Sequence, residues 1–358
     1  MSTRLVDQIT PTADALIPRA IACSNGLTVT VLPYGGRIQS IKLHGQELTL
    51  SQADPAFYLT DSAALGASVG RYANRIANAA YTDSSGATWP LNASQPPHCL
   101  HGGAQGFAQR VWTVLEHSAD SLLLELVSLN GDQGFPGTLT VRQLLRVVDT
   151  LDAKDQPAGE LQLCFTASTD AETVVNLTNH CYFNLAPQQT VEALAAHQLE
   201  LMAEQYLAVD ASGIPLPDAF RPVAGHQFDF RSAKAVGPVC RQTADLPHGL
   251  DHCFVYPVVA KSPAQDTKDA RDTIPLRARL RYSSGGSIGD STRTLELRST
   301  QPGVQVYVGT YLGSPFAPFQ GICLEAQNFP DAPNRADFPS ARLLPGELYQ
   351  QQIFYRFS

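Results

Sequence analysis

The sequence predicts an all-β protein built as a large antiparallel β-sandwich. Short runs in which apolar and polar residues alternate recur along the chain, as in Ser121 to Ser128, which reads S-L-L-L-E-L-V-S. Turn residues separate these runs, and long amphipathic helical patterns are absent. A β-sandwich can fill a chain of 358 residues as one domain. We therefore expect a lead-in with little pattern over residues 1–22 and a single domain over residues 23–358.

The expected elements follow in order along the chain. After Gly26, the runs L-T-V-T-V-L and R-I-Q-S-I-K-L flank a Pro/Gly turn and predict two short strands. Alternation predicts further strands at residues 121–128, 139–148, 160–166 and 294–298. Residues 191–202 combine helix-forming composition with an alternating end, so we expect a short helical turn followed by a strand. Residues 261–290 are rich in Pro, Ser, Asp, Lys and Gly, which predicts a surface excursion broken by the strand-like R-A-R-L-R-Y.

The stretch of residues 174–185, V-V-N-L-T-N-H-C-Y-F-N-L, indicates a functional face. As a strand it would direct apolar side chains to one side and polar side chains to the other, because strand side chains alternate. The polar side would carry Asn176, Thr178, His180, Tyr182 and Asn184. Such a row suits recognition of a neutral polar ligand. A half-exposed strand with an incidental histidine would give the same pattern, so both interpretations stay open.

Two later runs show the same alternation. Residues 304–309 read V-Q-V-Y-V-G, which sets Gln305 and Tyr307 opposite the valines. Residues 321–329 read G-I-C-L-E-A-Q-N-F, which sets Glu325 and Gln327 opposite Ile, Leu and Ala. If these runs share a sheet face with His180, a histidine and a glutamate form an acid/base pair in a polar cleft.

Three further positions are candidates for ligand binding. In G-R-Y-A-N-R-I, residues 70–76, Asn74 and Arg75 would face opposite ways on a regular strand, so both serve one ligand only if the chain bends. Arg75 would donate several hydrogen bonds to a ligand, or it would pair with one of the acidic residues. Asp251 comes just before an apolar strand and would either accept ligand hydroxyls or cap a turn.

His98, Cys99 and His101 are residue types that bind zinc. A tight loop ending in Gly-Gly explains their spacing equally well, and no second C-x-x-C or H-x-x-x-H completes a site. We therefore expect neither a metal nor another cofactor.

Composition excludes several classes of partner. The net charge is −8, from 25 Lys and Arg against 33 Asp and Glu, which disfavours nucleic acid. No apolar run approaches the roughly 18 residues of a membrane helix, and the start of the sequence lacks a secretory pattern. Seven scattered cysteines without a C-x-x-C indicate reduced thiols. We expect a cytoplasmic protein whose partner is a small molecule.

Seven segments and the end of the chain together resemble the aldose 1-epimerase, or galactose mutarotase, family. The segments come in the family's order and span nearly the whole chain. They read G-R-Y-A-N-R-I at 70–76, C-L-H-G-G at 99–103, V-N-L-T-N-H-C-Y-F-N-L at 175–185, F-D-F-R at 228–231, L-D-H-C-F at 250–254, P-G-V-Q-V-Y at 302–307, L-E-A-Q-N-F-P-D-A-P-N at 324–334 and F-P-S-A-R-L-L-P-G-E-L-Y at 338–349.

The resemblance implies a galactose mutarotase-like β-sandwich that interconverts the α and β anomers of free aldohexoses such as galactose and glucose. It implies that Glu325 is the general base and His180 the general acid. Sugar hydroxyls would be held by Asn74, Arg75, His101, Asp251 and Gln305, with Tyr182 beside them. From reference pKa values we expect Glu325 to be ionised at neutral pH, and His180 to be charged if nearby carboxylates favour it.

Other readings remain open at this point. The chain has Y-V-G-T at 307–310 where the family usually has Y-T-G-N, which affects sugar preference. A hexose 6-phosphate epimerase of the same fold would need a basic cluster, and a glycoside hydrolase would need two carboxylates across the scissile bond. A non-catalytic sugar-binding or regulatory module would keep Arg75 and Asp251 without needing Glu325 or His180. The preferred sugar and the choice between monomer and homodimer are left open.

Overall fold

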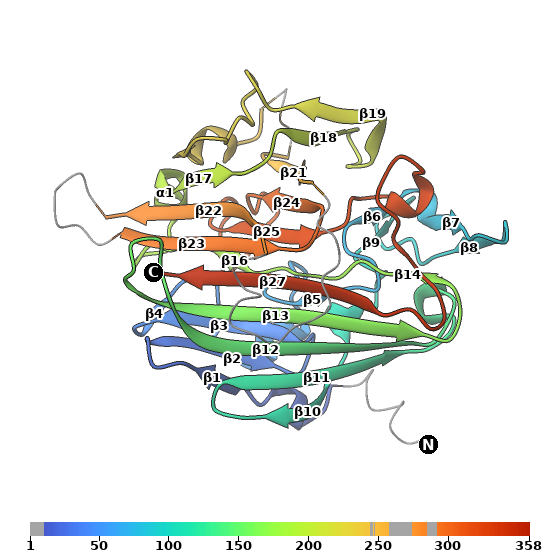
Figure 1. The fold of residues 1–358 in the computed structure, drawn as a ribbon, viewed down its shortest axis with the longest axis horizontal. Helices are drawn as coiled ribbons and strands as arrows, with labels where there is room; N and C mark the ends of the chain where they lie inside the picture. Colours follow the sequence, from blue (N-terminus) through green and yellow to red (C-terminus); the bar gives the residue numbers. More distant parts are fainter. Residues whose placement is uncertain (1–10, 244–245, 247, 258–273, 285–291) are drawn as a thin grey trace.

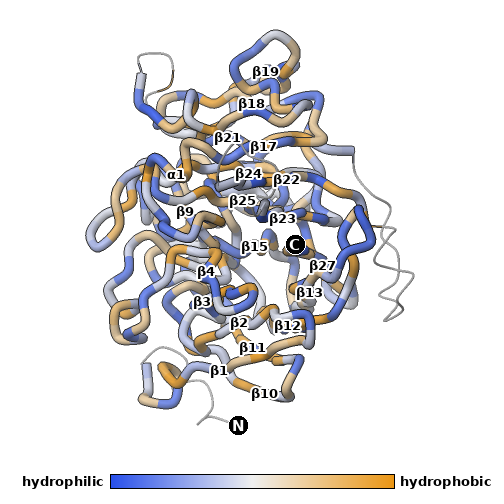
Figure 2. Tube along the Cα trace, turned by 90° about the vertical axis from the view of Figure 1, so that its left-hand side faces the viewer, coloured by the Kyte–Doolittle hydropathy of each residue, from blue (hydrophilic) through white to orange (hydrophobic). Residues whose placement is uncertain are grey.

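The computed structural model describes residues 11–243, 246, 248–257, 274–284 and 292–358. Its strands form two layers. The long strands of a nine-stranded sheet lie in front in Figure 1, and the smaller sheets lie behind them. The side view in Figure 2 separates β13, β22, β23 and β27 on the right from β3, β4, β24 and β25 on the left. All pairs between the named strands are antiparallel, so the predicted antiparallel β-sandwich is confirmed.

The nine-stranded sheet forms one layer. Its strand order is β10 (Thr113–His117), β11 (Ser121–Ser128), β12 (Leu139–Leu151), β13 (Pro157–Thr169), β27 (Tyr349–Phe357), β23 (Thr292–Ser299), β22 (Leu276–Ser283), β17 (Gln198–Leu201) and β20 (Lys234–Ala235).

The other layer contains a six-stranded and a four-stranded sheet. The six-stranded sheet has the order β16 (Tyr182–Phe183), β25 (Ile322–Gln327), β24 (Gly303–Tyr307), β21 (Asp251–Val255), β18 (Gln205–Val209) and β19 (Pro215–Pro222). The four-stranded sheet consists of β1 (Arg19–Ala22), β2 (Leu27–Leu32), β3 (Arg37–Leu43) and β4 (Gln46–Glu47).

Short elements connect these sheets. Four strand pairs are β5 (Ser68–Val69) with β15 (Thr178–Asn179), β6 (Arg75–Ile76) with β9 (Cys99–Leu100), β7 (Ala80–Thr82) with β8 (Thr88–Pro90), and β14 (Thr173–Val174) with β26 (Arg342–Leu343). The short 3-10 helices are η1 (Ala13–Leu16), η2 (Pro55–Leu59), η3 (Ala77–Ala79), η4 (Phe107–Gln109), η5 (Asp132–Gly134), η6 (Gly237–Val239) and η7 (Ala332–Asn334). Within the described residues, the one α-helix is α1 (Val191–Ala196), capped by the Thr190 hydroxyl, which accepts from the Ala193 N–H at 3.1 Å.

The largest of three apolar clusters among the described residues lies between the layers. It takes Leu124 and Leu163 from the nine-stranded sheet, Ile41 from β3, and Leu324 and Val306 from the six-stranded sheet. Burial of such apolar surface is the main driving force of folding. Because apolar side chains of β24 and β25 point into this core, the side chains between them point away from it.

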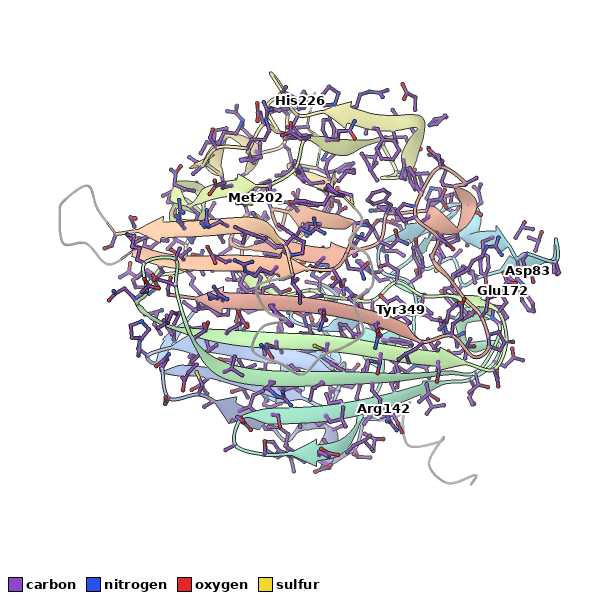
Figure 3. All side chains as sticks on the ribbon, viewed as in Figure 1. Asp83, Arg142, Glu172, Met202, His226 and Tyr349 are labelled. Carbon is purple, nitrogen blue, oxygen red and sulfur yellow. The ribbon has the colours of Figure 1, made fainter. Side chains whose placement is uncertain are left out.

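Two side chains of β27 tie the nine-stranded sheet to the layer that carries the candidate site. The hydroxyl of Tyr349, labelled in Figure 3, accepts a hydrogen bond from the backbone N–H of Leu177 at 3.2 Å. The side-chain amide of Gln351 donates to the carbonyl oxygen of Ala326 at 2.9 Å. These two bonds fix the backbone of residues 177 and 326 relative to the nine-stranded sheet.

Most of the expected elements are confirmed. β11 has the predicted bounds, β12, β13 and β23 extend the predicted runs, and residues 191–202 form a helix followed by a strand. The strand-like R-A-R-L-R-Y predicted within the excursion is confirmed, because residues 276–283 form β22 of the nine-stranded sheet. Most of the remaining excursion lies outside the described residues. In the expected lead-in, residues 19–22 form β1, which pairs with β2.

Candidate active site

Strand register builds the floor of the candidate site on the six-stranded sheet. Glu325 on β25 lies opposite Gln305 on β24, which in turn lies opposite Cys253 on β21. The next row, two residues along each strand, therefore faces the same way. That row contains Tyr182, Cys323, Tyr307 and Asp251.

Alternation explains why these polar residues share one face. Ile322, Leu324 and Ala326 on β25 belong to the large apolar core. Because neighbouring side chains of a strand point to opposite faces, Glu325 must point away from that core. The predicted placement of Gln305 and Glu325 opposite their apolar neighbours is thus confirmed.

His180 faces Glu325 from the segment between β15 and β16. Its backbone is fixed on both sides, because its N–H donates to Ala67 O and its carbonyl accepts from the Gly66 N–H, each at 2.9 Å. The Nε2 atom of His180 lies 3.7 Å from Oε1 of Glu325. Both side chains are buried, with 6% and 3% exposure. An imidazole and a carboxyl group therefore meet with little access for water.

Aromatic rings surround the imidazole of His180. The ring of Tyr182 lies 5.0 Å from it, that of His101 lies 5.5 Å from it in an edge-to-face arrangement, and that of Tyr307 lies 6.4 Å away. The Tyr182 hydroxyl donates to the carbonyl oxygen of Ala63 at 3.1 Å. Tyr182 thus restricts the ring of His180 while its own hydroxyl is already engaged.

Cys323 is a neighbour of His180 to which the sequence analysis gave no role. Its Sγ atom lies 3.5 Å from Nδ1 of His180, within the range of a sulfur hydrogen bond, and its side chain is fully buried. The sequence could have identified Cys323 as a site residue, because it lies two residues before Glu325 on the same strand and such residues share a face.

A bend in the chain brings Asn74 and Arg75 to the site together. Asn74 has φ +65°, a left-handed conformation that asparagine tolerates better than most residues. Its backbone N–H donates to Nδ1 of His101 at 3.2 Å, and the N–H of His101 donates back to its carbonyl oxygen at 3.0 Å. The Nε of Arg75 donates to Gln95 Oε1 at 2.8 Å. The chain therefore bends at Asn74, which the sequence analysis required if Asn74 and Arg75 are to serve one ligand.

Asp251 and Gln305 form a hydrogen-bonded pair beside Glu325. The side-chain amide of Gln305 donates to Oδ1 of Asp251 at 2.6 Å. Asp251 lies at the start of β21 and is half-buried, so its carboxylate is held by a neighbouring strand rather than by a turn. All eight predicted site residues therefore converge on one region of the six-stranded sheet and the loops that face it.

The electrostatics of this region differ from the expectation. Burial, together with the negative charge of Asp251, raises the pKa of Glu325 well above its usual value. Burial lowers the pKa of His180 to about 4, and it lowers the pKa of His101 well below the usual value. Both pKa shifts run against the expectation of an ionised Glu325 and of a His180 that is charged if nearby carboxylates favour it, because desolvation outweighs the neighbouring charges.

The polar row predicted for residues 174–185 also needs correction. The segment does not form one regular strand but the short strands β14, β15 and β16. Asn176 donates to Ala73 O at 3.0 Å, Thr178 donates to Ala326 O at 3.0 Å, and Asn184 donates to Gln320 O at 2.8 Å. These three side chains are fully buried and satisfy backbone carbonyls, so only His180 and Tyr182 of the row belong to the site.

The His98, Cys99 and His101 sequence does not gather into a zinc site. Nδ1 of His98 accepts from the Asn78 N–H at 3.1 Å and its Nε2 contacts the Ser212 hydroxyl at 3.1 Å, whereas His101 bonds to Asn74. Among the described residues, the group of His, Cys, Asp or Glu side chains close enough to hold a metal ion consists of His180, Cys323 and Glu325.

Comparisons with known proteins identify the family of this chain. A family model described as aldose 1-epimerase matches residues 19–356. The chain belongs to the aldose 1-epimerase family. As a member of that family it is an isomerase, an aldose 1-epimerase or mutarotase.

Relatives of this aldose 1-epimerase cover nearly its whole length. It is 34% identical to an aldose 1-epimerase of Escherichia coli, over 93% of this chain and 92% of that protein. It is 33% identical to a galactose mutarotase of Mus musculus, over 99% of this chain and 98% of that protein. The solved structure of an aldose epimerase homologue from C. elegans superposes with a TM-score of 0.79 at 28% identity, over 96% of this chain and 98% of that one. A galactose 1-epimerase from Lactobacillus acidophilus gives a TM-score of 0.75 at 25% identity, over 95% and 93% of the two chains.

Within this aldose 1-epimerase, the unusual Y-V-G-T sequence lies at the rim of the site. Thr310 is buried and its hydroxyl donates to the carbonyl oxygen of His248. Nδ1 of the same histidine contacts the hydroxyl of Tyr311, whose side chain is largely exposed. The side chains of Thr310 and Tyr311 therefore both contact His248, away from the pair of His180 and Glu325.

Proposed function

We propose that this chain interconverts the α and β anomers of free aldohexoses, galactose and glucose among them, with Glu325 as the base and His180 as the acid. The observation that carries the proposal is the buried contact of 3.7 Å between His180 Nε2 and Glu325 Oε1. Mutarotation requires one proton to leave the C1 hydroxyl and one to reach the ring oxygen. Two facing groups that share a single proton suffice for both transfers.

The proton balance of ring opening closes within the pair. The Glu325 carboxylate takes the proton of the C1 hydroxyl, the bond between C1 and the ring oxygen breaks, and His180 gives its Nε2 proton to that oxygen. The open aldehyde is then bound to a protonated Glu325 and a neutral His180. After rotation about the C1–C2 bond, the same groups exchange protons in the reverse sense and close the ring to the other anomer.

The pKa directions assign a role to each protonation state. In the unliganded site, the raised pKa of Glu325 and the lowered pKa of His180 place the shared proton on the carboxyl group. This neutral pair is the state that closes the ring. The charged pair, which opens the ring, must be stabilised by the bound sugar, whose hydroxyls donate to the carboxylate and replace lost solvation.

Unpartnered polar atoms support hydroxyl binding at this place. Among the described residues, Oε2 of Glu325 and Oε1 of Gln305 are buried and accept no hydrogen bond. A sugar hydroxyl donates readily to such oxygens. Asp251 adds a carboxylate acceptor, whereas Arg75, Asn74 and His101 supply donors, with Tyr182 packed beside them. The proposal that these residues hold the sugar rests on this distribution of donors and acceptors.

The proposal extends to the preferred sugar and to the cellular compartment. Relatives named galactose mutarotase and galactose 1-epimerase favour galactose as a substrate. None of the seven cysteines, all of which lie in the described part of the chain, forms a disulfide, which suits a reducing cytoplasm. Among the described residues, no helix has the length and apolar character of a membrane span.

Polarimetry on freshly dissolved α-D-galactose and α-D-glucose tests the proposal. The protein is expected to speed the approach to the equilibrium rotation for at least one of the two sugars. Glucose 6-phosphate serves as the control, because acceleration of this sugar alone would indicate a phosphosugar epimerase. Saturable sugar binding without any acceleration would overturn the proposal in favour of a sugar-binding module.

A further inference from the structure

Cys323 brings a third metal-binding side chain to the acid/base pair. Ring opening as proposed above assigns no proton transfer to a thiol, yet Cys323 is fully buried against His180. It lies two residues before Glu325 on β25, so both side chains point to the same face. A sulfur, an imidazole and a carboxyl group are the three ligand types that zinc-like cations prefer in proteins.

The spacing of these groups is close to that of a tetrahedral site. One donor atom from each of Cys323, His180 and Glu325 lies within 4.8 Å of the other two. Bonds of about 2.0–2.3 Å to sulfur, nitrogen and oxygen set neighbouring ligand atoms roughly 3.5 Å apart. The separation of Sγ from Nδ1 is 3.5 Å and that of Nε2 from Oε1 is 3.7 Å.

A small side-chain movement would bring all three donors onto one ion. The sulfur and the carboxyl group face different nitrogens of the His180 ring, so either the ring or the carboxyl group must turn, by roughly 1 Å at the donor atoms. The Glu325 carboxyl group is free to do so, because its buried Oε2 has no hydrogen-bond partner among the described residues.

Charge balance favours a divalent ion at this depth. On binding, Cys323 and Glu325 each release one proton to solvent and become a thiolate and a carboxylate, while His180 contributes a neutral nitrogen. The two negative charges then match the charge of the cation. Buried charges are tolerated when they are paired in this way.

We infer that Cys323, His180 and Glu325 form a binding site for a thiophilic divalent cation of the Zn²⁺ or Cd²⁺ class, whose occupation excludes the sugar. The cation takes the donor atoms that would exchange protons with the sugar. Reversible, sugar-competitive inhibition follows. The inhibition rests on the proposed function, whereas the binding of the ion does not.

Cadmium is the probe for binding, because a cadmium–thiolate bond adds ultraviolet charge-transfer absorption. Titration of the wild-type protein with Cd²⁺ is compared with that of Cys323→Ser and of Cys99→Ser. Cys99 is also buried and lies between His98 and His101, so its variant controls for the rival cluster and for other thiols. Cys323→Ser is expected to lose the tightest phase of the titration or to weaken it at least about tenfold, whereas Cys99→Ser keeps it.

Competition and activity provide the second readout. Galactose at saturating concentration should weaken the binding of Cd²⁺, and Zn²⁺ should slow mutarotation in a manner that a chelator reverses and more sugar overcomes. Equal cadmium affinity in wild type and Cys323→Ser would overturn the site. A tight cadmium phase that saturating galactose leaves unchanged would overturn the claim that the ion excludes the sugar.

If Cys323→Ser fails to fold, Glu325→Gln tests the metal site in its place. The amide has nearly the shape of the carboxyl group but no charge to offer, so we expect cadmium affinity to fall at least about tenfold. Because the absorption reports binding without turnover, a protein that binds cadmium as expected but accelerates no sugar would contradict the proposed function alone. Unchanged affinity in Glu325→Gln would contradict the metal site alone.

Discussion

The two faces of β25 are equally buried and are nevertheless opposite in character. Ile322, Leu324 and Ala326 pack into the large apolar core, whereas Cys323 and Glu325 face the candidate site. The apolar face leaves no polar atom without a partner. On the other face, Oε2 of Glu325 is buried without a hydrogen-bond partner among the described residues. Leaving a buried polar group unsatisfied costs about 1–3 kcal/mol. Burial alone therefore does not distinguish the core-facing side of β25 from the side that carries the candidate site, whereas the unpartnered carboxyl oxygen of Glu325 does.

Replacing Glu325 by Gln should give the largest effect on kcat and should distinguish the two faces of β25. The amide fills the same space but cannot take a proton, so we expect kcat to fall roughly a hundred- to ten-thousandfold. The free energy of unfolding should stay the same or rise, because a neutral amide replaces the buried ionisable carboxyl group. Polarimetry at saturating sugar measures the first quantity and chemical denaturation the second. A variant with wild-type kcat would remove Glu325 from the mechanism.

Replacing the adjacent Leu324 by Ala should produce the reverse pattern. Its side chain is buried in the main core, where such truncations cost about 2–5 kcal/mol. We expect this loss in urea denaturation, while kcat of the molecules that remain folded is retained, because Leu324 faces away from the site. If Leu324→Ala lowered kcat as strongly as Glu325→Gln, the division of β25 into two faces would fail.

Two buried histidines extend the comparison to the whole molecule. Burial lowers the pKa of both His180 and His197 to about 4. The difference lies in their partners: Nδ1 of His197 donates to Ala193 O at 2.7 Å and its Nε2 accepts from the Leu185 N–H at 2.9 Å. Both nitrogens of His197 thus bond to backbone, whereas Nε2 of His180 faces a carboxyl group.

His197→Leu should therefore reduce stability without reducing catalysis. The substitution leaves the Ala193 carbonyl and the Leu185 N–H unpartnered, at about 1–3 kcal/mol for each group. The variant should also lose less stability than wild type when the pH falls from about 6.5 to 4, since a neutral buried histidine is progressively disfavoured over that range. Denaturation at several pH values, with kcat as the control, distinguishes this from a catalytic role. Equal acid sensitivity in both proteins would contradict it.

The sequence was sufficient for the strands and for part of the site. In β24 and β25 every second residue is apolar, so the orientation of Gln305 and Glu325 follows from the period of a strand. Their pairing across neighbouring strands does not follow, because register depends on contacts between residues far apart in the chain. The resemblance to a family supplied that missing information for His101 and Asp251.

Tertiary contacts explain where prediction from sequence failed. The polar residues of 174–185 resemble a ligand-binding row, yet Asn176 and Thr178 bond to backbone carbonyls of residues 73 and 326. Those partners are brought near only by the fold. Likewise, the reference pKa values of Glu325 and His180 describe groups in water, whereas burial sets their values in the protein. Local pattern cannot report either effect.

The smallest predicted effect concerns Asp251 and the pH dependence of activity. The pair of His180 and Glu325 is active while it holds one proton. Acid adds a second proton to His180, so kcat/KM should fall as the pH drops toward about 4. Alkali removes the proton of Glu325, so kcat/KM should also fall as the pH rises through the raised pKa of that group. We expect a bell-shaped profile whose alkaline limb reports Glu325.

Asp251→Asn should move mainly that alkaline limb. The negative charge of Asp251 raises the pKa of Glu325, so removing the charge should shift the limb to lower pH. The acid limb should move far less, because burial dominates the pKa of His180. A lower overall kcat/KM is also expected, since a sugar acceptor is weakened, but loss of binding alone would leave both limbs in place. An unshifted alkaline limb would therefore assign Asp251 to sugar binding only, whereas a shifted one ties the charge on the polar face of the sheet to the proton that the reaction moves.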